Sequence, residues 1–273
     1  MPDRRIPRGI INERVARTKF TLTRHPPASA LTPFVQYYWI LRWDLRGQPP
    51  FEQRVLPNLS VHAVFFPGAD GVYGPMHDVF SYRLEGRVHG LGVRFRPGCF
   101  RPFLRQPVRN ITDRSIPLAE VFGPAADAAT ESIRNVNGDH EMAEVADNLL
   151  MANPPVLPPA AAHAAEAVET IDADPGITRV AQLCAATGLG LRSLQRLFAE
   201  HIGCTPKWAI RVYRLNDGAR RISGTTRPDY AGLAAQLGYS DQSHFTRDFR
   251  TVTGLSPGEY ARAAREDREH PRT

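Results

Sequence analysis

Lysine and cysteine are scarce in this sequence of 273 residues. Of its 34 basic residues two are lysines, Lys19 and Lys207, which leaves 32 arginines. The three cysteines, Cys99, Cys184 and Cys204, stand far apart and show neither CxxC nor Cys/His spacing. Because the cysteines are odd in number and widely spaced, the sequence predicts neither a disulfide framework nor a zinc site. We expect the cysteines to be small buried side chains.

The chain also lacks an apolar run of about 18 residues, the length that a membrane-spanning helix needs. Residues 1–20 include basic side chains, but no apolar core of a signal peptide follows them. We therefore expect a cytoplasmic protein with no membrane partner. The length suffices for two modest domains, each with its own core.

The positive charge is concentrated locally. The formal net charge of +6 is by itself a weak sign of a nucleic-acid partner, because clustering matters more than the total. Residues 192–250, however, hold ten basic residues against five acidic ones. A basic surface is therefore expected in the last hundred residues.

Residues 183–206 and 233–257 repeat one another. LCAATGLGLRSLQRLFAEHIGCTP and LAAQLGYSDQSHFTRDFRTVTGLSP each read as a helix that ends at glycine, a short turn and a second amphipathic helix. One residue is inserted in the second copy. The paired landmarks are Leu183 with Leu233, Gly188 with Gly238, Leu194 with Phe245, Phe198 with Phe249, Gly203 with Gly254 and Pro206 with Pro257.

The last helix of the second copy has clear boundaries. Ser240 or Asp241 can cap its start, and Gly254 is suited to a left-handed end. Beyond it, Ser256 and Glu259 form the pattern of a capping box, which starts another helix. Between the copies, PKWAIRVYRLNDGARRI (206–222) has one apolar seam and predicts a single connecting helix of roughly 25 Å.

The outward faces of the second helices carry side chains suited to reading bases. Arginine can pair with guanine O6 and N7, and glutamine with adenine N6 and N7. The candidate readers are Arg192, Gln195 and Arg196 in the first copy and Gln242, Ser243, His244 and Arg247 in the second. Arginines on one helix face would ordinarily be a solvated surface, but duplication with matched caps and faces favours DNA reading. We interpret Arg211, Arg214, Arg220, Arg221 and Arg250 as phosphate contacts or solvated charges.

GYSDQSHFTRDFRTVTGLSPGEYAR, residues 238–262, resembles the signature of the second unit in the DNA-binding domain of AraC/XylS-family transcription regulators. RLNDGARRI (214–222) resembles the linker sequence of that family, and the resemblance covers about residues 160–265. It implies two helix-turn-helix units joined by a long helix, double-stranded DNA and RNA polymerase as partners, and base contacts at the seven residues named above. Gly190 departs from the pattern, because serine often caps the helix there.

The first 160 residues are predicted to be rich in β-strands. Apolar and polar residues alternate most clearly in FVQYYWILRWDL (34–45), SVHAVFFPG (60–68) and RVHGLGVRFRPG (87–98), which are expected strands. Residues 116–136 and 139–153 are expected helices. This half more loosely resembles the cupin-like sensory domains of such regulators. The resemblance implies a small β-barrel that binds an effector or mediates homodimerisation. Tyr37, Tyr38, Trp39 and Trp43 fit either a pocket or, more in keeping with strand alternation, a core.

The sequence therefore predicts an α+β multidomain protein, with a β-rich cupin-like barrel and trailing helices before an all-α domain of two helix-turn-helix units. The predicted boundaries are a basic, mobile segment 1–24, a sensory or dimerisation domain 25–153, a proline-rich linker 154–160 and a DNA-binding domain 161–268. No cofactor or metal is expected, because His62, His77 and His89 lack a ligand spacing. The alternative is a β-barrel enzyme with a DNA-binding tail, which the lack of a catalytic constellation disfavours.

Overall fold

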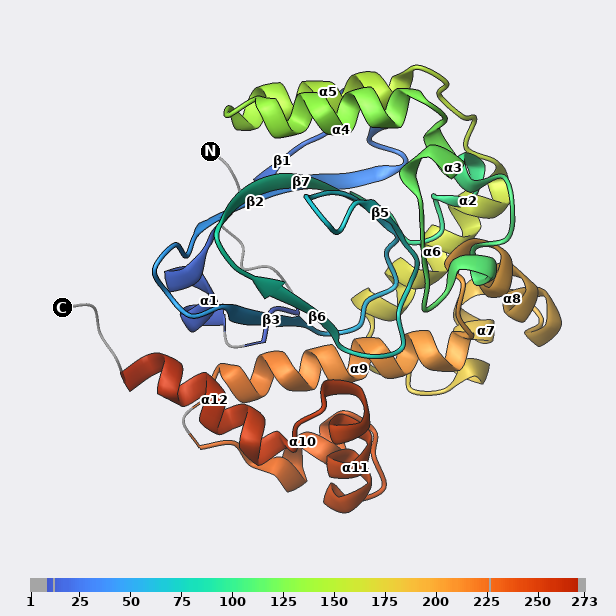
Figure 1. Cartoon of the computed structure of the whole chain (residues 1–273). Helices are drawn as coiled ribbons and strands as arrows, with labels where there is room; N and C mark the ends of the chain where they lie inside the picture. The colour runs from blue at the N-terminus through green and yellow to red at the C-terminus, as the bar shows by residue number, and fades with distance from the viewer. Residues whose placement is uncertain (1–8, 12, 226, 270–273) are drawn as a thin grey trace.

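Residues 9–11, 13–225 and 227–269 are described by a computed structural model of the chain (Figure 1). An N-terminal β-rich domain with trailing helices is followed by a C-terminal helical domain. The long helix α9 (Pro206–Ser223) lies along the side of the β-rich domain, and the last helices lie beyond it. The predicted fold class is confirmed.

Two antiparallel sheets face one another in the N-terminal domain (Figure 1). The larger sheet has the order β1-β2-β7-β4-β5-β8, and the smaller one pairs β3 with β6. The strands are β1 (Thr21–His25), β2 (Val35–Asp44), β3 (Phe51–Val55), β4 (His62–Phe65), β5 (Gly71–Tyr73), β6 (Phe80–Leu84), β7 (Arg87–Phe95) and β8 (Ser115–Ile116). The three strands expected from alternation are β2, β4 and β7, so these predictions are confirmed.

The two faces of strand β2 serve different purposes. Tyr38 and Ile40 are fully buried beneath α4 (Ala125–Asn135) and α5 (Asp139–Met151). Their neighbours Tyr37 and Trp39 point to the other face and line a cavity between the two sheets. Successive side chains of a strand alternate in direction, so a single aromatic run supplies both core and cavity wall.

Short helices complete this domain. They are η1 (Ser29–Leu31), α2 (Arg101–Leu104), η2 (Val108–Ile111) and α3 (Leu118–Phe122). The helix predicted over 116–136 is broken into α3 and α4 at Gly123, whose φ of 71° lies in the left-handed region. Pro124 follows directly, and a proline in a helix interior breaks the helix because it has no backbone N–H to donate.

The prediction of a mobile segment over residues 1–24 is wrong for residues 13–24; residues 1–8 and 12 lie outside the described part. Glu13–Lys19 forms α1, and β1 pairs with β2 in the register Thr21 to Arg42. Ala16 and Phe20 are buried in an apolar cluster that also contains Val64, Phe66 and Leu84. These two apolar side chains anchor the segment to the sheets. The composition of the segment, which is mostly polar, does not reveal this contact.

The C-terminal domain begins with α6 (Pro159–Ala173), whose first turn occupies the end of the predicted linker. Proline is tolerated there because the first helical N–H groups lack intrahelical partners. The following helices are α7 (Val180–Thr187), α8 (Leu191–Leu197), the π-helical η3 (Phe198–Ile202), α10 (Tyr230–Gln236), α11 (Gln242–Thr253) and α12 (Pro257–Glu269). None of the described helices is long and apolar enough to cross a membrane.

The two domains pack directly against each other. Leu56 shares an apolar cluster with Leu215 of α9, and the Asn216 side-chain amide donates to the Pro57 carbonyl at 3.1 Å. The Thr112 hydroxyl donates to the Gly203 carbonyl at 2.6 Å. The β-rich domain therefore contacts α9 and the end of the first helix-turn-helix unit.

Candidate functional sites

Helix α11 has the boundaries that its sequence predicts. Asp241 caps its start, because the Asp241 carboxylate accepts the His244 backbone N–H at 2.7 Å. That bond is the main reason why the pKa of the Asp241 carboxyl lies below its usual range. Gly254 ends the helix with a φ of 73°. The capping box after it is also present, with Ser256 N–H donating to Glu259 at 2.7 Å.

The buried stripe of α11 fixes which side of the helix faces solvent. Phe245 and Phe249 have no exposed surface, and their ring centroids lie 5.5 Å apart. Leu194 and Phe198 hold the matching positions in the first unit and are equally buried. Because these anchors face the core, the opposite faces of α8 and α11 lie at the surface.

All seven predicted reading residues are exposed. They are Arg192, Gln195 and Arg196 on α8 and Gln242, Ser243, His244 and Arg247 on α11. His244 also contacts its own unit, with Nδ1 3.2 Å from the Ser240 hydroxyl and its ring edge against Tyr239. Within the described residues the side chains of Arg192, Arg196 and Arg247 take part in no hydrogen bond or ion pair. Their guanidinium groups are therefore available to a partner.

The turns of the two units match in backbone conformation. Gly188 and Gly238 both occupy the left-handed region, with φ of 70° and 72°. Gly190 caps α8 through its backbone alone, without a side-chain hydrogen bond. The second helix of the first unit ends differently, because Gly203 N–H donates to the Phe198 carbonyl across a wider, π-helical turn.

The connector α9 is tied to the second unit by a polar network that the sequence interpretation missed. Arg211 pairs with Asp248 of α11 at 2.5 Å, and Asp248 also accepts the Tyr239 hydroxyl at 2.7 Å. Arg214 lies over the Tyr239 ring at 4.1 Å and donates to the Leu237 carbonyl at 2.7 Å. These contacts fix α11 relative to α9.

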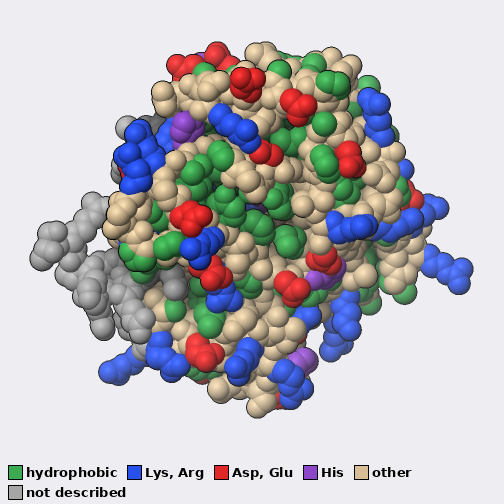
Figure 2. All heavy atoms as spheres, in the orientation of Figure 1, with side chains coloured by type: hydrophobic (Ala, Val, Ile, Leu, Met, Phe, Trp, Pro, Cys, Tyr) green, Lys and Arg blue, Asp and Glu red, His purple; other side chains and the backbone are tan. Residues whose placement is uncertain are grey.

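The five arginines interpreted as phosphate contacts or solvated charges therefore differ from one another. Arg211 and Arg214 hold the unit together, and Arg220 and Arg221 both pair with Asp217. Arg250 is exposed near the end of α11. Figure 2 shows Lys and Arg side chains gathered along the right and lower edges of the molecule, where Figure 1 places the C-terminal helices.

Comparison with known families agrees with this geometry. A helix-turn-helix domain family matches residues 183–263, which include α8, α9 and α11. The C-terminal domain is an AraC-type helix-turn-helix domain. The resemblance stated from the sequence is thus confirmed. A domain of unknown function, DUF6597, matches residues 23–117 in the β-rich half.

Two curated relatives match the AraC-type domain. The transcriptional activator NphR of a Rhodococcus species is 37% identical over 81 residues, which are 30% of this chain and 24% of NphR. The raffinose operon transcriptional regulatory protein RafR of Pediococcus pentosaceus is 29% identical over 84 residues, 31% of this chain and 30% of RafR. The matched region thus spans less than a third of either relative. ToxT of Vibrio cholerae aligns over 90% of this chain and 98% of its own, with 12% identity and a TM-score of 0.39.

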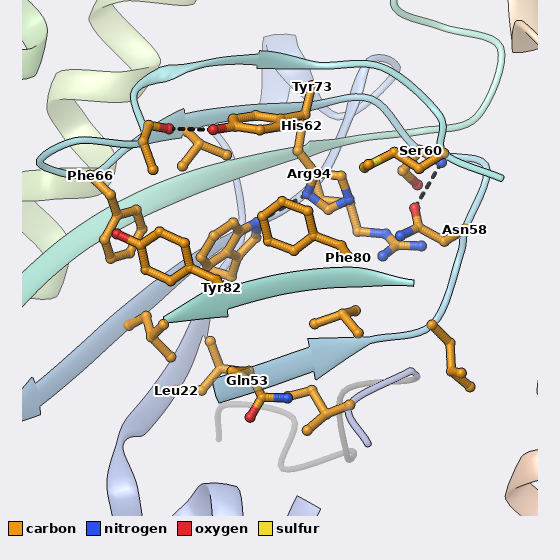
Figure 3. A pocket seen from close by; sticks show the side chains of 18 of the residues that line it. Leu22, Gln53, Asn58, Ser60, His62, Phe66, Tyr73, Phe80, Tyr82 and Arg94 are labelled. Atoms are coloured by element: carbon orange, nitrogen blue, oxygen red, sulfur yellow. Dashed lines mark hydrogen bonds between the residues drawn. The ribbon is translucent and has the colours of Figure 1, made fainter. Parts of the chain in front are cut away.

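A second candidate site lies apart from the AraC-type domain, in the cavity between the two sheets (Figure 3). The cavity measures about 200 Å³ and is lined mainly by aromatic and aliphatic side chains. Four polar side chains gather at one end of it: Asn58, Ser60, His62 and Arg94. From the sequence, His62 was a candidate for metal binding alone, and no pattern marked Ser60 or Arg94.

Strand pairing brings this polar end together. His62 in β4 and Arg94 in β7 are direct cross-strand partners, so their side chains stand side by side on the cavity face. The Trp39 indole N–H donates to His62 Nδ1 at 3.2 Å. Burial, and secondarily the charge of Arg94, lower the pKa of His62 to about 3. The ring is therefore neutral near pH 7, and its one proton lies on Nε2. Groups of three or more His, Cys, Asp or Glu side chains arranged to hold a metal ion do not occur in the described residues.

Proposed function

We propose that this chain is a sequence-specific DNA-binding transcription regulator whose N-terminal domain senses an effector or mediates dimerisation. The observation that carries the proposal is the duplicated helix-turn-helix unit, with both second helices presenting exposed arginines to solvent. The two relatives are named as a transcriptional activator and an operon regulatory protein, which supports the same class of function.

The connector gives the two units a spacing suited to duplex DNA. Helix α9 contains 18 residues, which corresponds to roughly 27 Å at the α-helical rise. Successive major-groove segments on one face of B-DNA recur about 34 Å apart. Two reading helices at the two ends of one rigid connector can therefore enter adjacent groove segments from a single chain.

The base readers in this proposal are the exposed residues at the solvent faces of α8 and α11. Arginine and glutamine provide bidentate contacts to purine edges, and serine or histidine a single hydrogen bond. We assign base reading to Arg192, Gln195, Arg196, Gln242, Ser243, His244 and Arg247. Bound to DNA, the chain would act on RNA polymerase, and the β-rich domain is available for effector binding or homodimer formation.

Binding-site selection tests the proposal directly. The full chain is incubated with a pool of random duplexes, bound molecules are sequenced, and affinities are measured for the enriched and scrambled sequences. We expect one enriched motif with two half-sites about one helical turn apart and an affinity at least about a thousandfold above that for scrambled DNA. Enrichment of no sequence, with equal affinity for all duplexes, would contradict sequence-specific regulation.

A further inference from the structure

The cavity between the sheets is large enough for a small organic molecule. Its volume of about 200 Å³ exceeds that of an apolar cavity of about 150 Å³ that holds benzene. Figure 2 shows a hollow on the face that looks along the barrel, rimmed by hydrophobic side chains. The cavity is therefore open to a ligand from solvent.

Aromatic rings form a flat wall along the apolar part of the cavity. The Trp39 indole stacks on Phe66 with ring centroids 5.6 Å apart and planes 19° apart. Tyr82 and Phe80 extend from β6 on the opposite side (Figure 3). Gly92 permits this arrangement, because a Cβ there would lie 2.0 Å from the Trp39 ring. The space between the Trp39 and Phe66 rings on one side and the Phe80 and Tyr82 rings on the other suits a planar ligand.

The polar end has hydrogen-bonding capacity that the described residues do not use. Ser60 is 2% exposed, and its hydroxyl oxygen has no hydrogen-bond partner. His62 Nε2 is also buried without a partner, and Trp39 fixes it as a donor. Buried polar groups without partners cost free energy, so an oxygen acceptor at this position would be stabilising.

Arg94 sets the charge that this end accepts. Its Nε donates to Gln36 at 2.9 Å, and within the described residues Arg94 forms no ion pair. Two of the three charged side chains in the lining are basic, namely Arg24 and Arg94, and the third is Asp78. In Figure 3 the Ser60 hydroxyl, the His62 ring and the Arg94 guanidinium converge on the same space. A carboxylate matches this donor set best, because arginine forms strong charge-assisted bonds to it.

We propose that the cavity binds a small aromatic carboxylate, with its ring against Trp39 and Phe66 and its oxygens held by Ser60, His62 and Arg94. This inference deepens the proposed function by giving the effector a chemical class. The binding step itself requires no DNA, so the two proposals fail independently.

Calorimetric titration of the full chain without DNA tests the ligand class. The probes are benzoate and its hydroxyl-substituted forms, toluene, benzylamine and cyclohexanecarboxylate. We expect an aromatic carboxylate to bind at least about tenfold more tightly than toluene or cyclohexanecarboxylate, and benzylamine not to bind. Failure of every aromatic carboxylate to bind, or equal binding of toluene, benzylamine or cyclohexanecarboxylate, would overturn the proposal.

Variants locate the binding site. Arg94→Gln and Ser60→Ala should each weaken aromatic carboxylate binding at least about tenfold while leaving toluene binding unchanged. Arg83→Gln is the matched control, because Arg83 lies exposed on β6 and pairs with Glu85. Circular dichroism checks that each variant is folded. If Arg94→Gln does not fold, the smaller Ser60→Ala change still tests the site. Unchanged carboxylate affinity in folded Ser60→Ala and Arg94→Gln proteins would show that binding occurs elsewhere and sink the assignment.

Discussion

The imidazole of His77 lies against the indole of Trp208, with ring centroids 4.6 Å apart. Trp208 belongs to the first turn of α9, whereas His77 follows Met76 and precedes Asp78, both of which line the barrel cavity. One short loop therefore contacts the cavity and the connector of the DNA-binding domain. Its position is fixed further by the bond between His77 Nδ1 and Asp113 at 2.7 Å.

A second segment makes the same kind of connection. Leu56 lines the cavity and packs in the cluster that contains Leu215 and Ala219 of α9. Pro57, also a cavity residue, accepts the Asn216 hydrogen bond. Both segments thus join the cavity lining to α9, and we expect a ligand in the cavity to change these contacts.

His77→Ala should therefore uncouple the two sites. We expect the variant to bind the cavity ligand and the DNA separately as the unmodified chain does, but the ligand should shift its DNA affinity at least about fivefold less. DNA titrations with and without saturating ligand measure this. His140→Ala, at an exposed position on α5, is the control. An undiminished ligand effect in His77→Ala would place the coupling elsewhere.

Local sequence patterns were sufficient for the helix-turn-helix units. The spacing of Phe245 and Phe249 and the glycine at 254 act within one or two helical turns, so each could be interpreted without knowing the fold. The cavity depends on pairings between distant residues. His62 and Arg94 are neighbours only because β4 and β7 pair, and apolar residues on both faces of β2 conceal which face is core.

The base-reading assignments remain predictions for a related reason. Exposure of Arg192 or Arg247 follows from helical periodicity, but a base contact depends on the DNA. The internal roles of Arg211 and Arg214 were not predicted, because their partners are distant in the sequence: Asp248 lies on α11 and the Leu237 carbonyl lies just after α10. Arginines on a helix face therefore indicated a DNA-binding surface, but their pattern did not distinguish the arginines that bind DNA from those that stabilise the fold.

Phe249→Ala should destabilise the protein through packing. Its ring is fully buried and contacts Phe245 and Tyr260. We expect a loss of about 3–5 kcal/mol in the free energy of unfolding, because the substitution leaves a cavity in the second unit. Urea denaturation measures it, with the exposed Arg250→Ala as the control. A loss below about 1 kcal/mol would mean that α11 does not pack as described.

His62, a half-buried residue whose Nε2 is fully buried, should make stability depend on pH. Its folded-state pKa of about 3 lies below the ordinary value of 6.5. As the pH falls from about 6.5 toward 3, the unfolded chain binds a proton that the folded chain does not, so the folded state loses stability. Between about pH 7 and pH 5 this contribution is on the order of 2 kcal/mol.

Urea denaturation at both pH values checks this contribution. His62→Gln retains an acceptor for the Trp39 indole but does not titrate, so it should lose less stability on acidification than the unmodified chain. Other groups, including the carboxylates, contribute equally to both proteins and cancel in the comparison. An identical loss in the two proteins would show that His62 takes up its proton in the folded state.

Arg247 and Arg250 distinguish base reading from general attraction. Both are exposed on α11, but Arg250 lies in the last turn, farther from the N-terminal part of the helix that enters a groove. Arg247→Ala should weaken binding to the specific site by about 1–3 kcal/mol and relax preference at one or two base pairs. Arg250→Ala should weaken specific and scrambled duplexes alike and reduce the salt slope by about one.

Titrations with specific and scrambled duplexes at several salt concentrations separate the two effects. Each variant serves as the control for the other, because both remove one exposed arginine from the same helix. If Arg247→Ala kept full sequence discrimination, the second unit would act as a phosphate clamp. Specificity would then have to come mainly from Arg192, Gln195 and Arg196 on α8, and substituting these residues should abolish it.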